Sequence, residues 1–550
     1  MQWMDEWTER QIGWDRIQKK LRPRSVYGQQ CKASRRPYCK GDEFAWQADR
    51  EDAMRLYASV GRGVLGDPAY SVWTGELSHM PDVRTISALL RQRGVLSLEQ
   101  VAALKRFAVQ TLTIDRELTQ SEALFAWWTI DGMAEVVRRL APRDVATRDF
   151  SMSDVNDAGY DQAFHAHQQA RMRRMSEERA FLLALANSYG VTTRRDATIV
   201  IVLDEEEKVA QAKADQRLRI RMLTSFDAVF DPVWSDEVRS LKRHEEACAE
   251  RLKQEEMRLL SVISVRLRPL AEAIENVVAS VGRFDELYAR VEMALSGVWA
   301  WSTLGTAIQV VQGRQPDILS WVPVDVVFHA RVAVLTGPNM GGKSAAQKTW
   351  LLLQACHQMG YPVPAVSYTA PLFAVLRYVG GDAQSLTGGL SSFGAEMVML
   401  KEALEADNGF VCFDEMGRHT NPVEGQAIVA SLLEELMARC SGQYVLATHF
   451  RLRDRGGAQY LRVAGIRENA LADANVGSLT KDEWIDRLDR MIDYRIVEAG
   501  DGDVPQQALT IAKWLGVPSS LLEKAHRILD ENQNRGDGNG QQTGSGSGQN

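Results

Sequence analysis

Arg331–Ser344, with the sequence RVAVLTGPNMGGKS, is the stretch that decides the fold of this 550-residue chain. Val332–Thr336 is apolar or β-branched and predicts a buried parallel strand. The residues after it fit G-x-x-x-x-G-K-[ST], and the following AAQKTWLLLQACHQMG predicts a helix. Strand, glycine loop and helix together indicate a phosphate-binding loop, in which backbone N–H groups and a helix N-terminus face the phosphates.

This loop supplies most of the residues that we expect to bind a nucleotide. Lys343 is expected to reach the outer phosphates of ATP, and the Ser344 hydroxyl is expected to ligate Mg²⁺. The predicted nucleotide-binding residues of the loop are Gly337, Pro338, Asn339, Met340, Gly341, Gly342, Lys343 and Ser344.

Two later apolar runs end in residues that suit the same chemistry. Phe410–Glu415 (FVCFDE) ends in two carboxylates: Asp414 can hold Mg²⁺ through water, and Glu415 can orient or deprotonate the attacking water. Tyr444–Ala447 precedes His449, which at the phosphate side of a strand can bond the γ-phosphate. The predicted catalytic residues are Glu415, His449 and Lys343, and the predicted metal ligands are Ser344 and Asp414.

Length and composition indicate a soluble chain of several domains. A single core stops growing at about 250–300 residues, so 550 residues predict more than one domain. Lys and Arg number 65 against 72 Asp and Glu, and this net charge of −7 means that any DNA contact must come from local basic patches. The six cysteines show no zinc-like CxxC spacing, and no apolar run suits a signal peptide or a membrane span. A cytoplasmic location fits best.

The pattern along the chain predicts an order of domains. Phe164–Ser188 predicts one helix, Thr198–Leu203 a short strand, and Ser235–Val281 a long helix that Pro269 kinks or divides. These helices suit either a lever arm with a small cap or an ordinary antiparallel pair. The expected domains are residues 1–160 (helical core), 161–300 (lever helices with a clamp-like insert), 301–500 (ATPase), 501–532 (C-terminal helical dimerisation element) and 533–550 (disordered tail).

Four segments in a fixed order carry a family resemblance. TGPNMGGKS, SSFGAEM (Ser391–Met397), FDEMGRHTNP (Phe413–Pro422) and ATHF (Ala447–Phe450) together resemble the MutS family of ABC-type ATPases. The resemblance implies an α/β P-loop ABC-type ATPase domain in the C-terminal part, preceded by a mostly α-helical core and lever. It extends to ALTIAKWLGVPSSLLEKAHRIL, which is similar to the family's C-terminal helical element, and covers the N-terminal half only loosely.

The resemblance also implies residue roles and an assembly. Asn339 lies in the loop that contacts the nucleotide, and Ser391 and Ser392 match signature serines that reach the γ-phosphate of the opposite subunit. The expected active unit is therefore a dimer, most simply a homodimer, with composite sites for ATP and Mg²⁺. Two residues depart from the family pattern: Ala345 stands where Thr is usual, and His419 interrupts the usual GRGT.

The mismatch-reading N-terminal domain of the family is expected to be absent, because the helical core begins almost at Met1. The family's Phe-x-Glu motif has a counterpart in Phe284-Asp285-Glu286, which we interpret as core packing because it lies deep in a helical stretch.

Two functions from different classes stay open at this point. One is ATP-dependent binding of mismatched, branched or junction DNA in repair or recombination, with Arg16–Lys40 and Arg171–Arg179 as basic candidates. The other is a chaperone that reactivates a cobalamin-dependent lysine or ornithine aminomutase, as truncated MutS-like ATPases with a similar TNP-x-EG text are thought to do. The acidic balance and the short insert at 190–232 favour a protein client, whereas family membership favours DNA.

Overall fold

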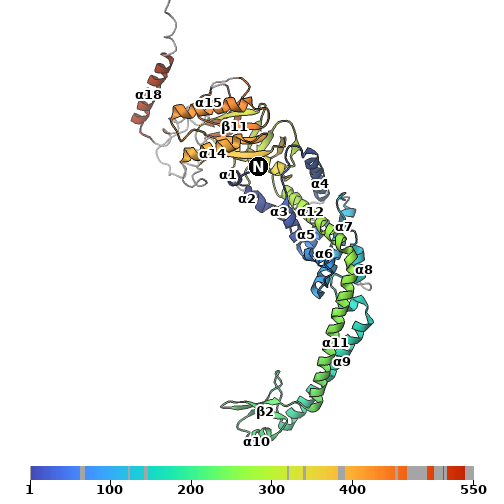
Figure 1. Ribbon diagram of the computed structural model, residues 1–550. Coiled ribbons are helices and arrows are strands. Elements are labelled where there is room, and N and C mark those ends of the chain that lie inside the picture. The colour runs from blue at the N-terminus through green and yellow to red at the C-terminus, as the bar shows by residue number, and fades with distance from the viewer. Residues whose placement is uncertain are drawn as a thin grey trace, which may run out of the picture. The chain divides into compact units, whose positions relative to one another are not determined.

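The computed structural model describes residues 2–61, 68–121, 124–140, 147–316, 318, 321–338, 342–381, 391–452, 456–466, 492–500, 509, 512 and 517–538 (Figure 1). The chain forms two compact units. The first comprises Met1–Pro23, Gln29–Val64 and Asp285–Asn550, and the second comprises Arg24–Gly28 and Leu65–Phe284. Within the described ranges, no helix combines the length and the apolar character that a membrane span requires.

A six-stranded sheet forms the centre of the first unit, with the strand order β13–β12–β7–β11–β10–β9. Its strands are β7 (Val332–Thr336), β9 (Val375–Gly380), β10 (Gly409–Asp414), β11 (Gln443–Ala447), β12 (Gln459–Ile466) and β13 (Ile492–Glu498). All neighbours pair in parallel except β13, which is antiparallel to β12. The carboxyl ends of β7, β10 and β11 therefore meet at one end of the sheet, where ligands bind in open α/β sheets.

Helices cover both faces of this sheet. On β7, Ala333 and Leu335 join the core that contains α13 (Lys343–Gln358), whereas Val332 and Val334 join the core that contains α15 (Pro422–Ala438). Burial on both faces explains why the strands are continuous apolar runs rather than alternating ones. The strand and helix predicted around the glycine loop are confirmed as β7 and α13.

The first residues of the chain close one edge of the sheet. The N–H of Leu376 on β9 donates to the carbonyl of Trp3 at 2.7 Å, and Met4 forms a parallel bridge with Leu376. The helices α1 (Glu6–Ile12) and α2 (Trp14–Lys20) bury apolar side chains in the same core as α13. An edge strand with unpaired backbone groups invites association, and this segment removes that liability from β9.

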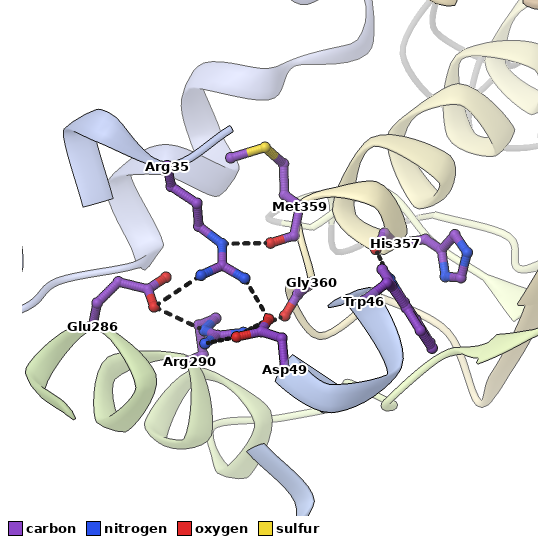
Figure 2. Close-up of polar contacts among 8 residues, drawn as sticks. All are labelled: Arg35, Trp46, Asp49, Glu286, Arg290, His357, Met359 and Gly360. Atoms are coloured by element: carbon purple, nitrogen blue, oxygen red, sulfur yellow. Dashed lines mark hydrogen bonds and ion pairs between the residues drawn. The ribbon is translucent and has the colours of Figure 1, made fainter. Parts of the chain in front are cut away.

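A cluster of four buried charges lies elsewhere in the first unit (Figure 2). Arg35 follows α3 (Val26–Ser34), Asp49 lies on α4 (Glu43–Gly61), and Glu286 and Arg290 lie one turn apart on α12 (Ala271–Leu295). Arg35 contacts both Asp49 and Glu286, and Arg290 lies 2.8 Å from Asp49 and 3.2 Å from Glu286. Burial alone would raise the pKa of Asp49, but the two guanidinium groups outweigh it and hold that pKa far below its usual range.

The same two arginines hold the end of α13. Arg35 Nε donates to the carbonyl of Met359 at 2.7 Å, and Arg290 Nη1 donates to the carbonyl of Gly360 at 2.9 Å. Gly360 has φ +67°, and a Cβ there would lie 2.7 Å from an Asp49 oxygen, so this position requires glycine. The indole of Trp46 donates to the carbonyl of His357 at 2.7 Å and fixes the same turn (Figure 2).

A second, smaller sheet completes the described strands of the first unit. Its order is β4–β8–β5–β6, with β4 (Thr303–Leu304), β5 (Gln309–Gly313), β6 (Val324–Val327) and β8 (Ser367–Ala370). Near the C-terminus, α18 (Ser519–Gly538) extends past residue 532, where we expected a disordered tail to begin. Helix ends are poorly defined by sequence, because fraying and capping decide them locally.

Two long helices dominate the second unit. Its helices include α5 (Pro68–Ser78), α6 (Arg84–Arg91), α7 (Leu98–Gln120), α8 (Met133–Leu140), α9 (Ala158–Tyr189), α10 (Glu206–Ala214) and α11 (Asp236–Leu267). Figure 1 shows α9 and α11 side by side, with α10 and the three-stranded sheet at their far end. That sheet has the order β1–β3–β2, with β1 (Ile199–Val202), β2 (Leu218–Leu223) and β3 (Asp227–Pro232). The two predicted helices and the predicted short strand are confirmed.

The two predictions for the segment around Pro269 and Phe284 are also confirmed. A 3₁₀ turn at Arg268–Leu270, which contains Pro269, separates α11 from α12. Phe284 is fully buried and makes edge-to-face contacts with Trp73 and Trp128, with ring centroids 5.7 and 5.5 Å apart. Its side chain is part of the core, as expected.

Candidate active site

The loop between β7 and α13 has the backbone that glycine permits. Gly342 precedes α13 with φ +88°, and a Cβ there would lie 3.0 Å from the Tyr494 ring. Gly337 follows β7 with φ +147°, and a Cβ there would lie 3.0 Å from Val463. Both positions combine a conformation rare for other residues with a close neighbour. The predicted ligands Asn339, Met340 and Gly341 lie outside the described residues.

Lys343 is buried at the start of α13, with its ammonium group turned back toward the loop. Its Nζ donates to the carbonyls of Gly337 at 3.0 Å and Pro338 at 3.2 Å. It also lies 3.3 Å from Glu415 Oε1, so the predicted phosphate ligand and the predicted base form an ion pair. This arrangement holds a cation at the mouth of the loop, within reach of the carboxylate that follows β10.

Asp414, at the end of β10, shares a hydroxyl partner with Ser344. Tyr378 on β9 donates to Asp414 Oδ2 at 2.6 Å and also hydrogen-bonds the Ser344 hydroxyl. Burial, followed by the nearby Asp414 charge, raises the pKa of Tyr378, so its hydroxyl keeps the proton that it donates. Tyr378 thereby brings the two predicted metal ligands together, and no local motif indicated this tyrosine.

The second oxygen of Asp414 bears on whether Mg²⁺ fits here. Asp414 Oδ1 is buried and has no hydrogen-bond partner among the described residues. A buried carboxylate oxygen without a partner is unfavourable unless a cation or water satisfies it. Mg²⁺ takes few protein ligands and draws the rest from phosphates and water, so one carboxylate and one hydroxyl fit its requirements.

Glu415 occupies a strained position between two cations. It has φ +50°, which is uncommon for a residue other than glycine, and its N–H donates to the carbonyl of Ala447 on β11 at 2.9 Å. Its carboxylate lies 3.3 Å from Lys343 and 3.6 Å from Arg418. Strain of this kind persists where the surroundings fix the side chain, and it occurs often at active sites.

Ser344, Asp414 and Glu415 line one pocket of about 290 Å³. Its lining combines three predicted residues with five that sequence reasoning assigned no role: Ser344, Asp414 and Glu415, and Gly380, Gly381, Glu396, Arg418 and His419. The segments that contain Glu396, Arg418 and His419 are visible in the sequence as SSFGAEM and GRHT, but nothing in their local pattern indicates that they meet at a pocket.

The described loop residues Gly337, Pro338, Gly342 and Lys343 are not among the lining residues, although Lys343 lies 3.3 Å from Glu415, and three further predicted residues also lie apart from this lining. Ser391 is exposed and caps α14 (Ser392–Leu404), with its Oγ accepting a hydrogen bond from the Gly394 N–H at 3.2 Å; Ser392 is the first residue of that helix. His449 is exposed just after β11, and its ring packs against Phe450 with centroids 4.2 Å apart. None of the three is among the described residues that line the pocket.

Comparison with known proteins agrees with the family resemblance noted in the sequence. Residues 333–533 match the family model of MutS domain V, the ATPase domain of MutS proteins.

The chain is similar to MutS proteins. It is 25% identical over 296 residues to a DNA mismatch repair protein MutS from Listeria monocytogenes, which covers 51% of this chain and 32% of the relative. It is 29% identical over 294 residues to an endonuclease MutS2 from Clostridium botulinum, which covers 51% of this chain and 34% of the relative. An endonuclease MutS2 from Gemmatimonas aurantiaca is 34% identical over 204 residues, or 35% of this chain and 24% of the relative.

The aligned segment spans about a third or less of the length of these relatives. The matches show a likeness to MutS proteins, in which the matched domain V is the ATPase domain.

Proposed function

We propose that this chain is a magnesium-dependent P-loop ATPase of the ABC type, which works as a dimer and uses ATP to control binding to mismatched, branched or junction DNA in repair or recombination. One observation carries the ATPase part. Ser344, Asp414 and Glu415 line a single pocket, and Lys343 lies 3.3 Å from Glu415. Phosphate ligand, metal ligands and base are the parts that phosphoryl transfer to water requires.

Each residue has one task in the proposed reaction. Lys343 and the loop backbone bind the phosphates, and Ser344 and Asp414 would hold Mg²⁺, which neutralises phosphate charge when bound with ATP. Glu415 orients a water and accepts its proton. The water oxygen bonds to the γ-phosphorus as the bond from that phosphorus to the ADP oxygen breaks. His449 would contact the γ-phosphate of bound ATP. This contact requires a local rearrangement, because the His449 ring packs against Phe450 in the structure.

The dimer is proposed because of where the signature serines lie. Ser391 and Ser392 are at the N-terminus of α14, outside the pocket lining of their own chain. A helix N-terminus with hydroxyl groups suits a phosphate, and a second subunit would bring one to each pocket. Each ATP would then be held by the phosphate loop of one subunit and the serines of the other.

DNA is the proposed partner, because the relatives are named a DNA mismatch repair protein and an endonuclease. With a net charge of −7, binding must rest on local patches. Arg35, one expected contact, is instead buried with Asp49 and Glu286, and Arg174 pairs with Glu178 and Glu245. The exposed candidates on α9 are Arg171, Arg173 and Arg179.

The test is a titration with homoduplex, mismatched duplex and a four-way junction at two salt concentrations, with and without ATP. We expect affinity to fall steeply with salt, because each neutralised phosphate releases counterions. We expect little preference for a mismatch, because Phe284 is fully buried and cannot stack on a base. A strong mismatch preference would contradict this expectation.

The matched variants remove three arginines each. The triple variant Arg171→Ala, Arg173→Ala, Arg179→Ala should bind DNA more weakly. The slope of log affinity against log salt concentration should become shallower by about three, or about one for each lost phosphate contact. The control removes Arg84, Arg91 and Arg239, which already pair with Asp82, Glu275 and Asp236, and should bind as the parent protein does. Absence of binding to all three DNAs at low salt, with or without ATP, would overturn the DNA proposal and leave the ATPase proposal standing.

A further inference from the structure

Glu396 is a buried carboxylate that the proposed hydrolysis does not use. It lies on α14, in the turn that follows Ser391 and Ser392, and its side chain is 8% exposed. Its Oε1 accepts a hydrogen bond from the N–H of Gly417 at 2.7 Å. Its Oε2 is buried and has no hydrogen-bond partner among the described residues. A carboxylate in this environment needs a nearby positive charge or donor to be stable.

His419 is the side chain that faces this second oxygen. Its Nδ1 lies 3.6 Å from Glu396 Oε2, and its side chain is 28% exposed. Glu396 and His419 line the same pocket as Asp414 and Glu415. One carboxylate on α14 therefore contacts both the backbone and a side chain of the segment that directly follows Glu415.

That segment has little freedom of its own. Gly417 has φ +75°, and a Cβ there would lie 2.9 Å from the Cα of Gly425 in α15. A Cβ on Gly425 would lie 2.6 Å from the carbonyl oxygen of Gly417. The segment is pressed against one helix and hydrogen-bonded to another, so a shift of Glu415 must be shared with its neighbours.

We propose that Glu396 and His419 are a positioning pair that joins the segment of Glu415 to the helix of Ser391 and Ser392. This inference rests on the proposed ATPase function and on serines that act across a dimer. The carboxylate that works on a subunit's own ATP and the serines that it presents to its partner's ATP would then move as one piece. Each subunit would thereby report the state of its own pocket to the other.

The first experiment measures steady-state ATP hydrolysis by variants of this pair. Glu396→Ala should lower kcat on the order of 10²-fold, the cost of misplacing a catalytic group by about 1 Å, with little change in KM. Glu396→Gln keeps an acceptor for the Gly417 N–H and should recover most of that loss. The control is Glu402→Gln, which changes an exposed carboxylate of the same helix and should hydrolyse ATP as the parent does.

A structural defect is separated from a positioning defect by two further variants. If Glu396→Ala does not fold, Glu396→Gln and His419→Ala still test the pair, because the first retains the shape of the side chain and the second changes a partly exposed residue. His419→Ala should lower kcat more than it raises KM, and Glu396→Gln should show a smaller loss of kcat, because it keeps the acceptor for the Gly417 N–H but loses the charge that faces His419. A kcat equal to that of the parent in both variants would overturn the proposal.

The second experiment uses mixed dimers in which Lys343→Ala silences one phosphate loop. The remaining active pocket faces the serines of the silenced subunit. Glu396→Ala placed in the active subunit should slow hydrolysis in its own pocket, and placed in the silenced subunit it should slow hydrolysis in the partner's pocket. Slowing in the first arrangement alone would overturn the link to the serines, and so would a chain that stays monomeric with ATP.

Failure of the underlying function gives a different result. If the Lys343→Ala homodimer hydrolyses ATP as the parent does, the proposed active site itself is wrong. If that homodimer is inactive and Glu396→Ala leaves ATP hydrolysis by the mixed dimers unchanged, only the proposal of a positioning pair is overturned.

Discussion

The proposed nucleotide pocket and the cluster of Arg35, Asp49, Glu286 and Arg290 are both groups of buried charges in one unit, yet they differ in ion pairing and in backbone strain. In the cluster, each charge forms an ion pair with an opposite one and two carbonyls accept from the arginines, although Glu286 Oε1 and Arg290 Nε have no hydrogen-bond partner among the described residues. In the pocket, an oxygen of Asp414 has no hydrogen-bond partner among the described residues, and Glu415 keeps φ +50°. Ion pairs between opposite charges connect distant parts of the fold, whereas the strained backbone of Glu415 at the carboxyl end of the sheet indicates a site for a ligand.

The largest expected effect is the loss of ATP hydrolysis in a variant that leaves the fold intact. Glu415→Gln should bind ATP with normal affinity and hydrolyse it about 10²–10⁴-fold more slowly, because the amide cannot accept the proton of the attacking water. Its unfolding free energy should change by less than about 1 kcal/mol, since the amide oxygen can still accept from Lys343. Single-turnover hydrolysis and chemical denaturation measure the two quantities, and hydrolysis at the parent's rate would refute the assignment of the base.

The next largest effect is the loss of stability in a variant that disrupts the cluster and leaves the pocket intact. Arg290→Met should lower the free energy of unfolding by about 3–5 kcal/mol, because two buried carboxylates would keep only Arg35 as a partner. The folded fraction should hydrolyse ATP at the parent's rate. Denaturation curves are compared with those of Lys19→Met, which breaks an exposed ion pair with Asp15 and should cost less than about 1 kcal/mol.

An opposite result would change the interpretation of the cluster. If Arg290→Met were as stable as Lys19→Met but hydrolysed ATP slowly, the four charges would belong to the catalytic machinery rather than to the fold.

The sequence predicted the parts of this comparison unequally. The strand, glycine loop and helix at 332–358 were predictable because their pattern is local, as were the strand ending at Asp414 and the helices α9 and α11. The cluster was not predictable, because Arg35 and Glu286 lie 251 residues apart and meet only in the folded unit. Arg35 was instead expected among exposed basic residues, since a charge gives no local sign that it will be buried.

The lining of the pocket was predictable only in part, for the same reason. Ser344, Asp414 and Glu415 belong to motifs with known spacing. Glu396 lines the pocket from helix α14, and Tyr378 on the neighbouring strand β9 contacts Asp414, and neither position is marked by a local pattern. Nor did any pattern indicate that Trp3 and Met4 would pair with the edge at β9. The catalytic, nucleotide-binding and metal-binding roles of the site residues stay predictions.

A smaller effect sharpens the comparison inside the pocket. Tyr378→Phe removes the hydroxyl that donates to Asp414 at 2.6 Å. The affinity for Mg²⁺ should fall about 10–100-fold, as it commonly does when a metal ligand loses a hydrogen bond. The measurement is the Mg²⁺ dependence of hydrolysis at saturating ATP. The control is Tyr368→Phe. The Tyr368 hydroxyl donates to Gln354 Oε1 at 2.6 Å, and neither residue lines the pocket, so this variant should leave the Mg²⁺ dependence unchanged. An equal shift in both variants would contradict the role of Tyr378.

The smallest effect tests whether the neighbourhood of the cluster stores stability that depends on pH. Burial lowers the pKa of His357 to about 3, and its Nδ1 lies 2.8 Å from the Ser302 hydroxyl. An unfolded imidazole titrates near 6.5, so between pH 3 and 6.5 the unfolded chain binds one proton more than the folded chain. The contribution of His357 to the free energy of unfolding should therefore be complete above pH 6.5. It should decrease as the pH falls, by about 2 kcal/mol at pH 5.

His357→Asn keeps a polar group near Ser302 but cannot take up that proton. Its unfolding free energy should thus be nearly independent of pH between 7.5 and 5, apart from the slope that other groups contribute equally to both proteins. Urea denaturation at several pH values, with the exposed His329→Asn as control, measures the difference in slope. The control should keep the slope of the parent, because the His329 side chain is 68% exposed in the folded chain. If His357→Asn also kept the parent's slope, His357 would take up its proton as readily in the folded chain as in the unfolded one, which would contradict the effect assigned to burial.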